Sequence, residues 1–476
     1  MPADVPSDPA LASAIELVAL YRSKALSPVE ATKAALARIE RHGTAVNAWV
    51  HLDPDGAVAA ARASEARWQV GTPRGLLDGV PIGVKDNILA AGMPARFGSC
   101  LTSPAPRESD APAVARVRAA GAVLLGKTAM PEYGWKATSD SPLTGVTRNP
   151  WDTRVTTGGS SAGAVAATVL GMGALHLGTD GGGSIRIPAA FTGCFGIKPT
   201  RARVPAHPAA PLGTLAHVGP LARTVADAAL ALTVIAAPDA RDVYAWPTPA
   251  PDFRDGLDAG VRGLRIALSP RLGYAPRLHP EVESAIAGAA RVFEGLGAIV
   301  EEADPDMGGD PIAVWNTFWW PAMRYQLEAL GERWRALADP ALVAAVDGSP
   351  PVWVADHLRA QLKRADLHNA FFHFHQTYDL LLTPALPLPA FEAGALVPPS
   401  GEWGTAWADW SPFSYPFNLT TQPAASVPCG LTAAGLPVAL QIVGPIGADA
   451  LVLRAARAFE QARPFPMLDA PRSPEA

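Results

Sequence analysis

The chain has 476 residues, which is long enough to bury a large hydrophobic core. Hydrophobic residues make up 49% of the sequence and charged residues 17%, a composition typical of globular proteins. The formal net charge of −5 argues against the basic surface that nucleic-acid binding usually requires, so no nucleic-acid partner is expected.

The cysteines and the first residues give two further expectations. Cys100, Cys194 and Cys429 lie far apart and form no CxxC pair, which is typical of buried free thiols. The first residues, Met1 to Asp4, show neither the basic segment nor the apolar run of a secretory signal. We therefore expect a cytoplasmic location.

The N-terminal segment, residues 1–70, is predicted to be mainly helical. Apolar residues recur at helical spacing from Leu11 to Leu20. The motif Ser27–Glu30 then combines a capping serine, a proline suited to the first turn and a glutamate that can complete a capping box. A short extended run at 47–50 and another helix at 57–68 follow.

Two lysines stand at the ends of predicted strands. Residues 78–85 form an apolar run that is predicted to be a strand ending at Lys85. A helix at 112–120 and a buried strand at 122–127, ending at Lys127, complete a βαβ-like unit. A lysine in this position is often a solvated edge residue, but either lysine is also a candidate for a buried base.

Two glycine-rich loops follow, and each contains a serine. Residues 158–163 include Ser160, and residues 178–186 include Ser184. Glycine lets the backbone approach a ligand, and successive N–H groups can converge on an anionic oxygen. The intervening segment 162–175 has no charge and is rich in Ala, Gly and Val, which predicts a helix packed on every side. It is shorter than the ~20 residues of a membrane span. A nucleophile beside such donors suits acyl transfer.

The second half begins with a connection and another α/β unit. Proline and aspartate are frequent in residues 236–260, which predicts a surface connection. A strand at 264–268, a helix at 280–296 and a strand at 298–301 follow. This alternation favours a largely parallel or mixed sheet covered by helices.

Tryptophans are concentrated in residues 311–410. Eight of the chain's 13 tryptophans lie there: Trp315, Trp319, Trp320, Trp334, Trp353, Trp403, Trp407 and Trp410. Such rings either form core or line a pocket, and we expect at least two to border a substrate pocket or its entrance. Regular patterns return near the end of the chain, at residues 378–384, 418–420 and 435–444.

Three of these motifs together resemble the signature of the amidase signature hydrolases. They are Pro81–Asn87, Gly158–Gly163 and Gly181–Arg186, which occur in the order and at the spacing of that family. One departure is Ala162, where the family usually has glycine, and its methyl group is expected to affect packing rather than chemistry. The resemblance extends over most of residues 11–465 and is weakest in the middle. Residues 378–384, 418–420 and 435–444 resemble the family's last strands, and residues 448–461 resemble its closing helix.

The resemblance implies an α/β fold in which a large mixed, mostly parallel central sheet is covered by helices on both faces. It also implies a single amidase domain over residues 1–476. Its expected parts are the N-terminal helices (1–70), the catalytic core (71–235), a variable tryptophan-rich substrate region (305–410) and the closing strands and helix (411–465).

The resemblance further implies a Ser–cis-Ser–Lys triad. Ser184 would be the nucleophile, Ser160 the bridging cis-serine and Lys85 the terminal base, whereas Lys127 lies in a segment similar to a structural part of the family. A serine attacks an amide only if another group removes its proton, and neither serine loop contains a histidine. A buried lysine can do so, because desolvation lowers its pKa from about 10.4.

The remaining site residues are also implied by the resemblance. The oxyanion hole would consist of the backbone N–H groups of Gly181, Gly182, Gly183 and Ser184. Thr179, Asp180 and Arg186 are expected behind the loop, where a charged Asp–Arg pair can brace it. No cofactor and no metal are expected.

The expected reaction is hydrolysis of an amide C–N bond through an acyl-enzyme. The aromatic content favours apolar or aryl amides and anilides, and carbamates (urethanes) and esters remain open. A small-molecule amide or carbamate is the expected partner, with no membrane, and the chain is expected to be a monomer or homodimer. One alternative shares all the motifs: the A subunit of a tRNA-dependent glutamine amidotransferase.

Two other functions are disfavoured by their missing motifs. His373 and His375 could suggest a metal amidohydrolase, but the sequence offers them no HxxH or HExxH partner. The run Gly181–Ser184 could suggest a phosphate-binding loop, but it lacks the GxxxxGK[ST] spacing.

Overall fold

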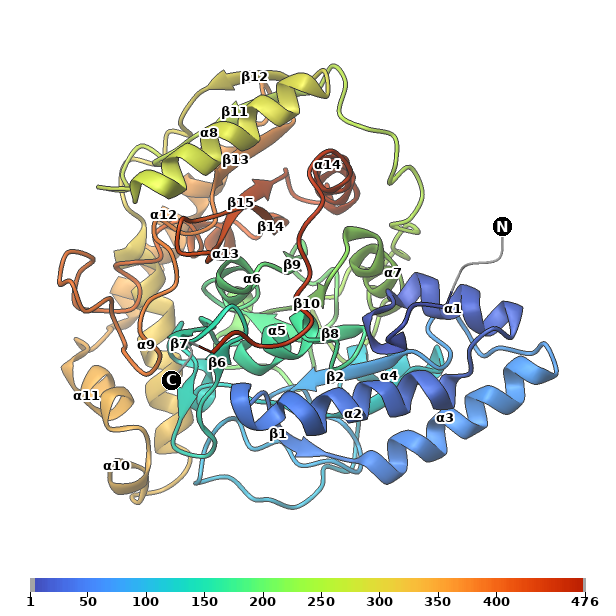
Figure 1. Ribbon diagram of the computed structural model, residues 1–476. Coiled ribbons are helices and arrows are strands. Elements are labelled where there is room, and N and C mark those ends of the chain that lie inside the picture. Colours follow the sequence, from blue (N-terminus) through green and yellow to red (C-terminus); the bar gives the residue numbers. More distant parts are fainter. Residues whose placement is uncertain (1–4, 474–476) are drawn as a thin grey trace.

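The structure is a computed structural model, and it describes residues 5–473. An eleven-stranded sheet runs through the centre of the molecule (Figure 1). Its strands lie in the order β1 (Trp49–Leu52), β3 (Val123–Thr128), β2 (Pro81–Lys85), β8 (Leu175–Asp180), β10 (His217–Ala222), β9 (Phe195–Lys198), β14 (Ala424–Leu431), β15 (Pro437–Val443), β13 (Leu380–Pro384), β11 (Arg265–Leu268) and β12 (Ile299–Glu302). Two hairpins lie outside it: β4 (Asp140–Ser141) with β5 (Gly145–Val146), and β6 (Arg148–Asn149) with β7 (Asp152–Thr156). Residues 1–4, on which the signal-peptide expectation depends, lie outside the described residues.

The sheet is mixed, as expected, but the prediction that it is mostly parallel is wrong. Six of its ten neighbouring strand pairs are antiparallel. The parallel pairs join β2 to β3 and β8, and β11 to β12 and β13. The alternation of strands and helices in the sequence correctly predicts parallel pairing in these two parts of the sheet. The hairpin of β14 and β15 is different, because a connection as short as residues 432–436 can only form an antiparallel pair.

Fourteen α-helices are described, and the predicted long ones are present. They are α1 (Ala14–Ser23), α2 (Pro28–Val46), α3 (Pro54–Gln69), α4 (Pro112–Ala119), α5 (Ala162–Val169), α6 (Arg186–Thr192), α7 (Val225–Ile235), α8 (Pro280–Gly295), α9 (Ile312–Glu328), α10 (Trp334–Leu337), α11 (Pro340–Gly348), α12 (Val354–Phe374), α13 (Pro416–Leu419) and α14 (Asp449–Ala462). The predicted capping box opens α2, where Ser27 Oγ accepts from the Glu30 N–H and the Glu30 carboxylate accepts from the Ser27 N–H.

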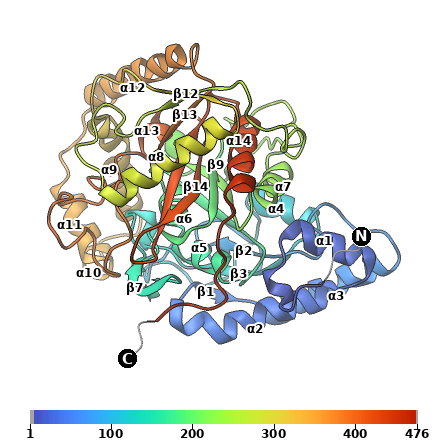
Figure 2. The ribbon, with the colours of Figure 1, turned by 45° about the horizontal axis from the view of Figure 1, so that its top comes forward.

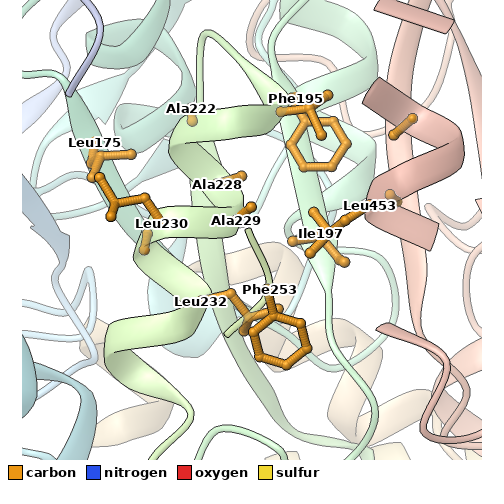
Figure 3. Close-up of a cluster of buried hydrophobic side chains, with 14 of the residues drawn as sticks. Leu175, Phe195, Ile197, Ala222, Ala228, Ala229, Leu230, Leu232, Phe253 and Leu453 are labelled. Atoms are coloured by element: carbon orange, nitrogen blue, oxygen red, sulfur yellow. The ribbon is translucent and has the colours of Figure 1, made fainter. Parts of the chain in front are cut away.

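Helices cover both faces of the sheet, as expected. Alternate side chains of β3 enter different cores: Leu124 packs in the cluster that includes α4, α7 and α14, whereas Val123 and Leu125 pack with α2, α3 and α5. Figure 2 shows α8 and α14 crossing one face of the sheet. In the core that contains Leu124, Leu230 of α7 lies close to Leu175 of β8, and Leu453 of α14 lies opposite them across the cluster (Figure 3).

The helix predicted at 162–175 is shorter than expected. Helix α5 ends at Val169, and β8 begins at Leu175. Gly171 and Gly173, with φ angles of 65° and 126°, turn the chain between them, a conformation that favours glycine. The predicted burial is confirmed, because every residue of α5 is buried. Nowhere in residues 5–473 is there a helix long and apolar enough to cross a membrane.

The three cysteines are free thiols in two different environments. Cys194 and Cys429 are buried, as expected. The prediction is wrong for Cys100, which is exposed. Cys100 lies in a turn outside any helix or strand, where hydrophobic periodicity gives no information about burial.

Candidate active site

Lys85 and Ser160 meet at the carboxyl ends of two parallel strands. Lys85 is the last residue of β2, and the adjacent strand β8 brings Thr179 beside it. Lys85 Nζ lies 2.8 Å from Ser160 Oγ and 2.9 Å from Thr179 Oγ1. The Lys85 side chain is fully buried, so it is not the solvated edge residue that its sequence position also allowed.

The environment of Lys85 makes its neutral form accessible. Burial lowers the pKa of Lys85 to about 7, and the nearby carboxylates of Asp180 and Asp86 oppose part of this shift. At neutral pH about half of the amine is therefore unprotonated and able to accept a proton.

Close contacts fix the backbone of the first serine loop. The peptide bond between Gly159 and Ser160 is cis. A Cβ atom on Gly159 would lie 2.1 Å from the carbonyl oxygen of Thr138, and one on Gly134 would lie 2.9 Å from Ser160 Oγ. Both positions therefore exclude larger residues, and the segment 134–138 holds the loop in place.

The second serine loop is joined to the first through the backbone. The N–H of Ser161 donates to the carbonyl oxygen of Ser184 at 3.1 Å. No hydrogen bond within residues 5–473 joins the hydroxyls of Ser160 and Ser184. Ser184 is 8% exposed, compared with 3% for Ser160 and 0% for Lys85. Solvent and ligands can therefore reach Ser184 more readily than the other two residues.

The expected ion pair between Asp180 and Arg186 is present. Arg186 Nε and Nη2 each lie 3.0 Å from an oxygen of the Asp180 carboxylate. The same carboxylate accepts from the N–H groups of Gly183 at 2.7 Å and Ile185 at 3.2 Å. Burial alone would raise the pKa of Asp180, but the Arg186 guanidinium and these hydrogen bonds hold it below its usual range. The carboxylate thus fixes the loop on both sides of Ser184.

The Gly183 N–H group does not serve the oxyanion hole to which the family resemblance assigns it. It points to Asp180, so it is not free to stabilise an oxyanion. The N–H groups of Gly181, Gly182 and Ser184 have no acceptor within the described part of the chain. The structure therefore leaves three of the four expected donors available.

Two amide side chains that the sequence motifs did not reveal complete this network. Arg186 Nη1 donates to Gln441 Oε1 at 2.8 Å, and Arg186 Nη2 donates to Asn418 Oδ1 at 2.7 Å. Asn418 Nδ2 in turn donates to Asp180 Oδ1 at 2.9 Å. A signal for Gln441 was present, since it is the one amide in an otherwise apolar and fully buried strand, and a buried amide requires partners.

Tryptophans pack directly behind the glycine loop. Trp315 Nε1 donates to the carbonyl oxygen of Gly181 at 3.2 Å, and the ring stacks on Trp319 with a centroid separation of 4.4 Å. Trp407 meets Trp315 edge-on at 5.3 Å. A Cβ atom on Gly182 would lie 2.8 Å from the Trp315 ring, so the rings support the loop from behind.

A cavity of about 350 Å³ borders the site at Thr179, Asp180 and Gly181. Its other walls are largely apolar or aromatic and include Phe97, Tyr133, residues 205–212, Tyr325 and Leu330. None of the eight tryptophans lines this cavity, and the expectation that at least two of them border the substrate pocket or its entrance stays a prediction. The sequence does not distinguish rings packed behind the loop from rings facing a ligand, because both kinds of ring are buried.

Lys127, the second candidate base, is buried away from the serines. Its Nζ donates to the backbone carbonyl of Ile88, and burial lowers its pKa to about 8. His375 is also engaged, because Nδ1 lies 2.9 Å from the carbonyl of Tyr378 and Nε2 lies 2.8 Å from Gln422 Nε2. Among residues 5–473, no three histidine, cysteine or acidic side chains gather as metal ligands.

Comparison with known proteins identifies the family. The family model described as Amidase matches residues 30–329 and 345–453. The chain belongs to the amidase signature family. This amidase is 37% identical to the A subunit of the glutamyl-tRNA(Gln) amidotransferase of Myxococcus xanthus, over 96% of this chain and 98% of the relative. It is 36% identical to an acylamidase of Rhodococcus erythropolis, over 95% and 96% of the two chains.

A solved structure agrees with this assignment. The amidase superposes on a bacterial aryl acylamidase of the amidase signature family with a TM-score of 0.89 and 33% sequence identity. The match covers 95% of this chain and 96% of the other. The chain therefore has the fold of amidase signature enzymes and is an amide C–N hydrolase.

Proposed function

We propose that this amidase hydrolyses amides with an aryl or other apolar group, through an acyl-enzyme formed on Ser184. The observation that carries the proposal is the 2.8 Å contact between the buried amine of Lys85 and Ser160 Oγ, beside a loop in which three N–H groups have no acceptor among residues 5–473. The largely apolar cavity next to Gly181 supports an apolar substrate. Similarity to an acylamidase and an aryl acylamidase supports the same class.

The first half-reaction forms the acyl-enzyme. Neutral Lys85 takes the proton of the Ser160 hydroxyl while Ser160 takes the proton of Ser184, whose Oγ attacks the amide carbonyl carbon. The carbonyl electron pair moves onto oxygen, where the N–H groups of Gly181, Gly182 and Ser184 stabilise the charge. Loss of one such donor typically costs ~3 kcal/mol of transition-state stabilisation.

Breakdown of the intermediate releases the amine. The C–N bond breaks, and the leaving nitrogen takes a proton from Ser160, which recovers one from the Lys85 ammonium. A water molecule then attacks the acyl group while its proton passes through Ser160 to Lys85. Ser184 leaves with a proton returned along the same path, and the carboxylic acid is released.

Three further parts of the proposal concern the substrate classes, the domain organisation and the partners. Carbamates and esters fit the same steps, because each offers a carbonyl carbon and a leaving group. We take residues 1–476 as one amidase domain, with 71–235 as its catalytic core and 305–410 as its substrate region. Residues of this segment line the cavity and support its assignment as the substrate region, among them Tyr325 of α9 and Leu330, which follows that helix. The partner is a small molecule, and the chain acts as a monomer or homodimer.

An activity screen with one substitution tests the proposal. Purified enzyme is assayed on p-nitroanilides, aliphatic amides and aryl carbamates, beside the Ser184→Ala variant. We expect hydrolysis of the aryl substrates and at least a ~10³-fold loss in Ser184→Ala with an unchanged circular dichroism spectrum. Ser103→Ala, which removes an exposed hydroxyl, is the control and should keep wild-type activity. Substantial turnover by Ser184→Ala would exclude it as the nucleophile.

A second candidate function is supported by the Myxococcus relative, which is one component of an amidotransferase. In that function the enzyme would release ammonia from glutamine and depend on partner proteins. Affinity purification from the native cell tests for such partners. Glutamine hydrolysis that appears only with a copurified protein, together with no activity on anilides, would favour this function over the first.

A further inference from the structure

A groove of about 890 Å³ lies between helices α9 and α12, which pack against each other. We call it the α9–α12 groove. Much of its wall is apolar or aromatic and consists of Pro211, Leu212, Phe318, Pro321, Ala322 and Tyr325. Three of these residues, Pro211, Leu212 and Tyr325, also line the cavity at Gly181, so the two spaces are neighbours. Its volume is in the range of small-molecule sites, and its wall suits a ligand with an apolar body.

The guanidinium group of Arg364 lies in the wall of this groove. Its Nε donates to the carbonyl oxygen of Leu419 at 2.6 Å, and its Nη1 donates to the hydroxyl of Thr214. Its Cζ lies 5.6 Å from the centre of the Phe318 ring. All three neighbours line the groove, so the charged end of Arg364 lies there and not only its alkyl chain.

The charge of Arg364 is not balanced by a carboxylate. The described residues that line the groove include no aspartate and no glutamate. The two carboxylates of α12 pair elsewhere, Asp356 with Arg359 and Asp366 with Lys363. A half-buried guanidinium without a counter-charge is unfavourable, and an anion in the groove would relieve this cost.

One nitrogen of this guanidinium is available to a ligand. Arg364 Nη2 makes no hydrogen bond within residues 5–473. Every fully buried side-chain polar atom that lacks a partner there belongs to another residue, so Nη2 is accessible to solvent. Burial lowers the pKa of Arg364 to about 10, and the positive charge of Arg201 adds to this shift. The group stays charged at neutral pH and can donate a charge-assisted hydrogen bond to an anion.

We infer that the α9–α12 groove is a binding site for a carboxylate carried on an apolar or aromatic group, with Arg364 Nη2 as the contact to the anion. Arg364 is the one permanently charged residue in the described part of the wall, which matches a single negative charge. The inference goes beyond the proposed function, because binding to the groove does not require turnover.

Calorimetric titration of the wild-type enzyme tests the site. The probes are 4-phenylbutyrate and 4-phenyl-1-butanol, which share the phenyl ring and the alkyl chain and differ in charge. We expect the carboxylate to bind at least ~10-fold more tightly than the alcohol, because only the carboxylate accepts a charge-assisted hydrogen bond. Arg364→Gln should reduce the ratio of the two affinities to about one.

A second variant keeps every contact of Arg364 and so keeps the test decisive if Arg364→Gln does not fold. Gln361 is an exposed residue of α12 that lines the same groove. Gln361→Glu places a competing carboxylate there and should weaken 4-phenylbutyrate binding at least ~10-fold, with the alcohol unchanged. Gln376→Glu, an equal change of charge at an exposed residue outside the groove, should leave both affinities unchanged. A carboxylate bound at the catalytic loop instead would respond to none of these substitutions.

Kinetic measurements distinguish two sources of the carboxylate. The mono-p-nitroanilides of adipic, suberic and sebacic acid are compared with their methyl esters. A higher kcat/KM for the free acids, lost in Gln361→Glu, would show that the groove holds the far end of a substrate. Binding of 4-phenylbutyrate without such a preference would show that the groove holds a separate molecule, such as the acid that the proposed reaction releases.

The inference and the proposed function fail on different results. No measurable binding of 4-phenylbutyrate, equal affinities for the two probes, or a preference that both groove variants retain would refute the site. An absence of Ser184-dependent hydrolysis would refute the proposed function and leave binding to the groove intact.

Discussion

The buried position of Lys85 has a consequence for stability that does not depend on the substrate. Burial lowers its pKa to about 7 in the folded protein, whereas an unfolded chain titrates lysine near 10.4. Between these two pH values the unfolded state binds more protons than the folded state. Stability conferred by this site therefore rises with pH, and below about pH 7 the full penalty of burying the charge is present. Replacing Lys85 by methionine removes that penalty.

The magnitude follows from the two pKa values. Relative to a neutral side chain, Lys85 destabilises the folded protein by about 4 kcal/mol at pH 7 and by less than about 1 kcal/mol at pH 10. The stability advantage of Lys85→Met over the wild type should therefore fall by about 3 kcal/mol between these pH values. Losses that do not depend on pH, such as packing changes, cancel in this comparison.

Urea unfolding at pH 7, 8, 9 and 10 measures the difference, by linear extrapolation to water. Lys33→Met, in which an exposed lysine of α2 is replaced, controls for removing a lysine from the unfolded chain. A Lys85→Met advantage that stays constant from pH 7 to pH 10 would refute the reasoning. The lysine would then not have a lowered pKa in the folded protein and would not be half neutral at pH 7.

Three predictions concern catalysis. Wild-type kcat/KM should increase with pH, from ~1% of its plateau value at pH 5 to half of that value near pH 7, because neutral Lys85 is the working form. A midpoint near pH 10 would contradict this prediction. Ser160→Ala should lose at least ~10²-fold in kcat/KM at pH 6, 7 and 9 alike, because it removes the relay; a wild-type profile would rule the relay out. Dialysis against EDTA should leave the rate unchanged. A loss of activity that added zinc restores would show that catalysis depends on a metal ion.

Local signals in the sequence were sufficient for many of the elements. The capping box at Ser27 and Glu30 placed the start of α2 correctly, because the interaction involves neighbouring residues only. The apolar run before Lys85 and the helical pattern of α8 and α14 are local in the same sense. The motifs around Ser160 and Ser184 identified the loops for the same reason.

Features that depend on distant residues were not predictable. Arg186 and Gln441 are 255 positions apart, and no pattern in either segment indicates that they meet. The hydrogen bond from the Gly183 N–H to Asp180 joins residues only three positions apart, but it depends on the exact turn of the loop, which a run of glycines does not determine. The direction of the central strands likewise depends on which strands become neighbours, and strand–helix alternation does not determine that.

The choice of the catalytic base likewise depends on a contact with a distant residue and not on a local property of the lysine. Three lysines of residues 5–473, Lys85, Lys127 and Lys198, are fully buried, and burial lowers their pKa values to about 7, 8 and 7. A lowered pKa therefore does not single out a base in this protein. Lys127 and Lys198 donate to backbone carbonyl oxygens, which have no proton to give. Lys85 faces the hydroxyl of Ser160, which does, and so the geometry at the end of β2 favours it as the base.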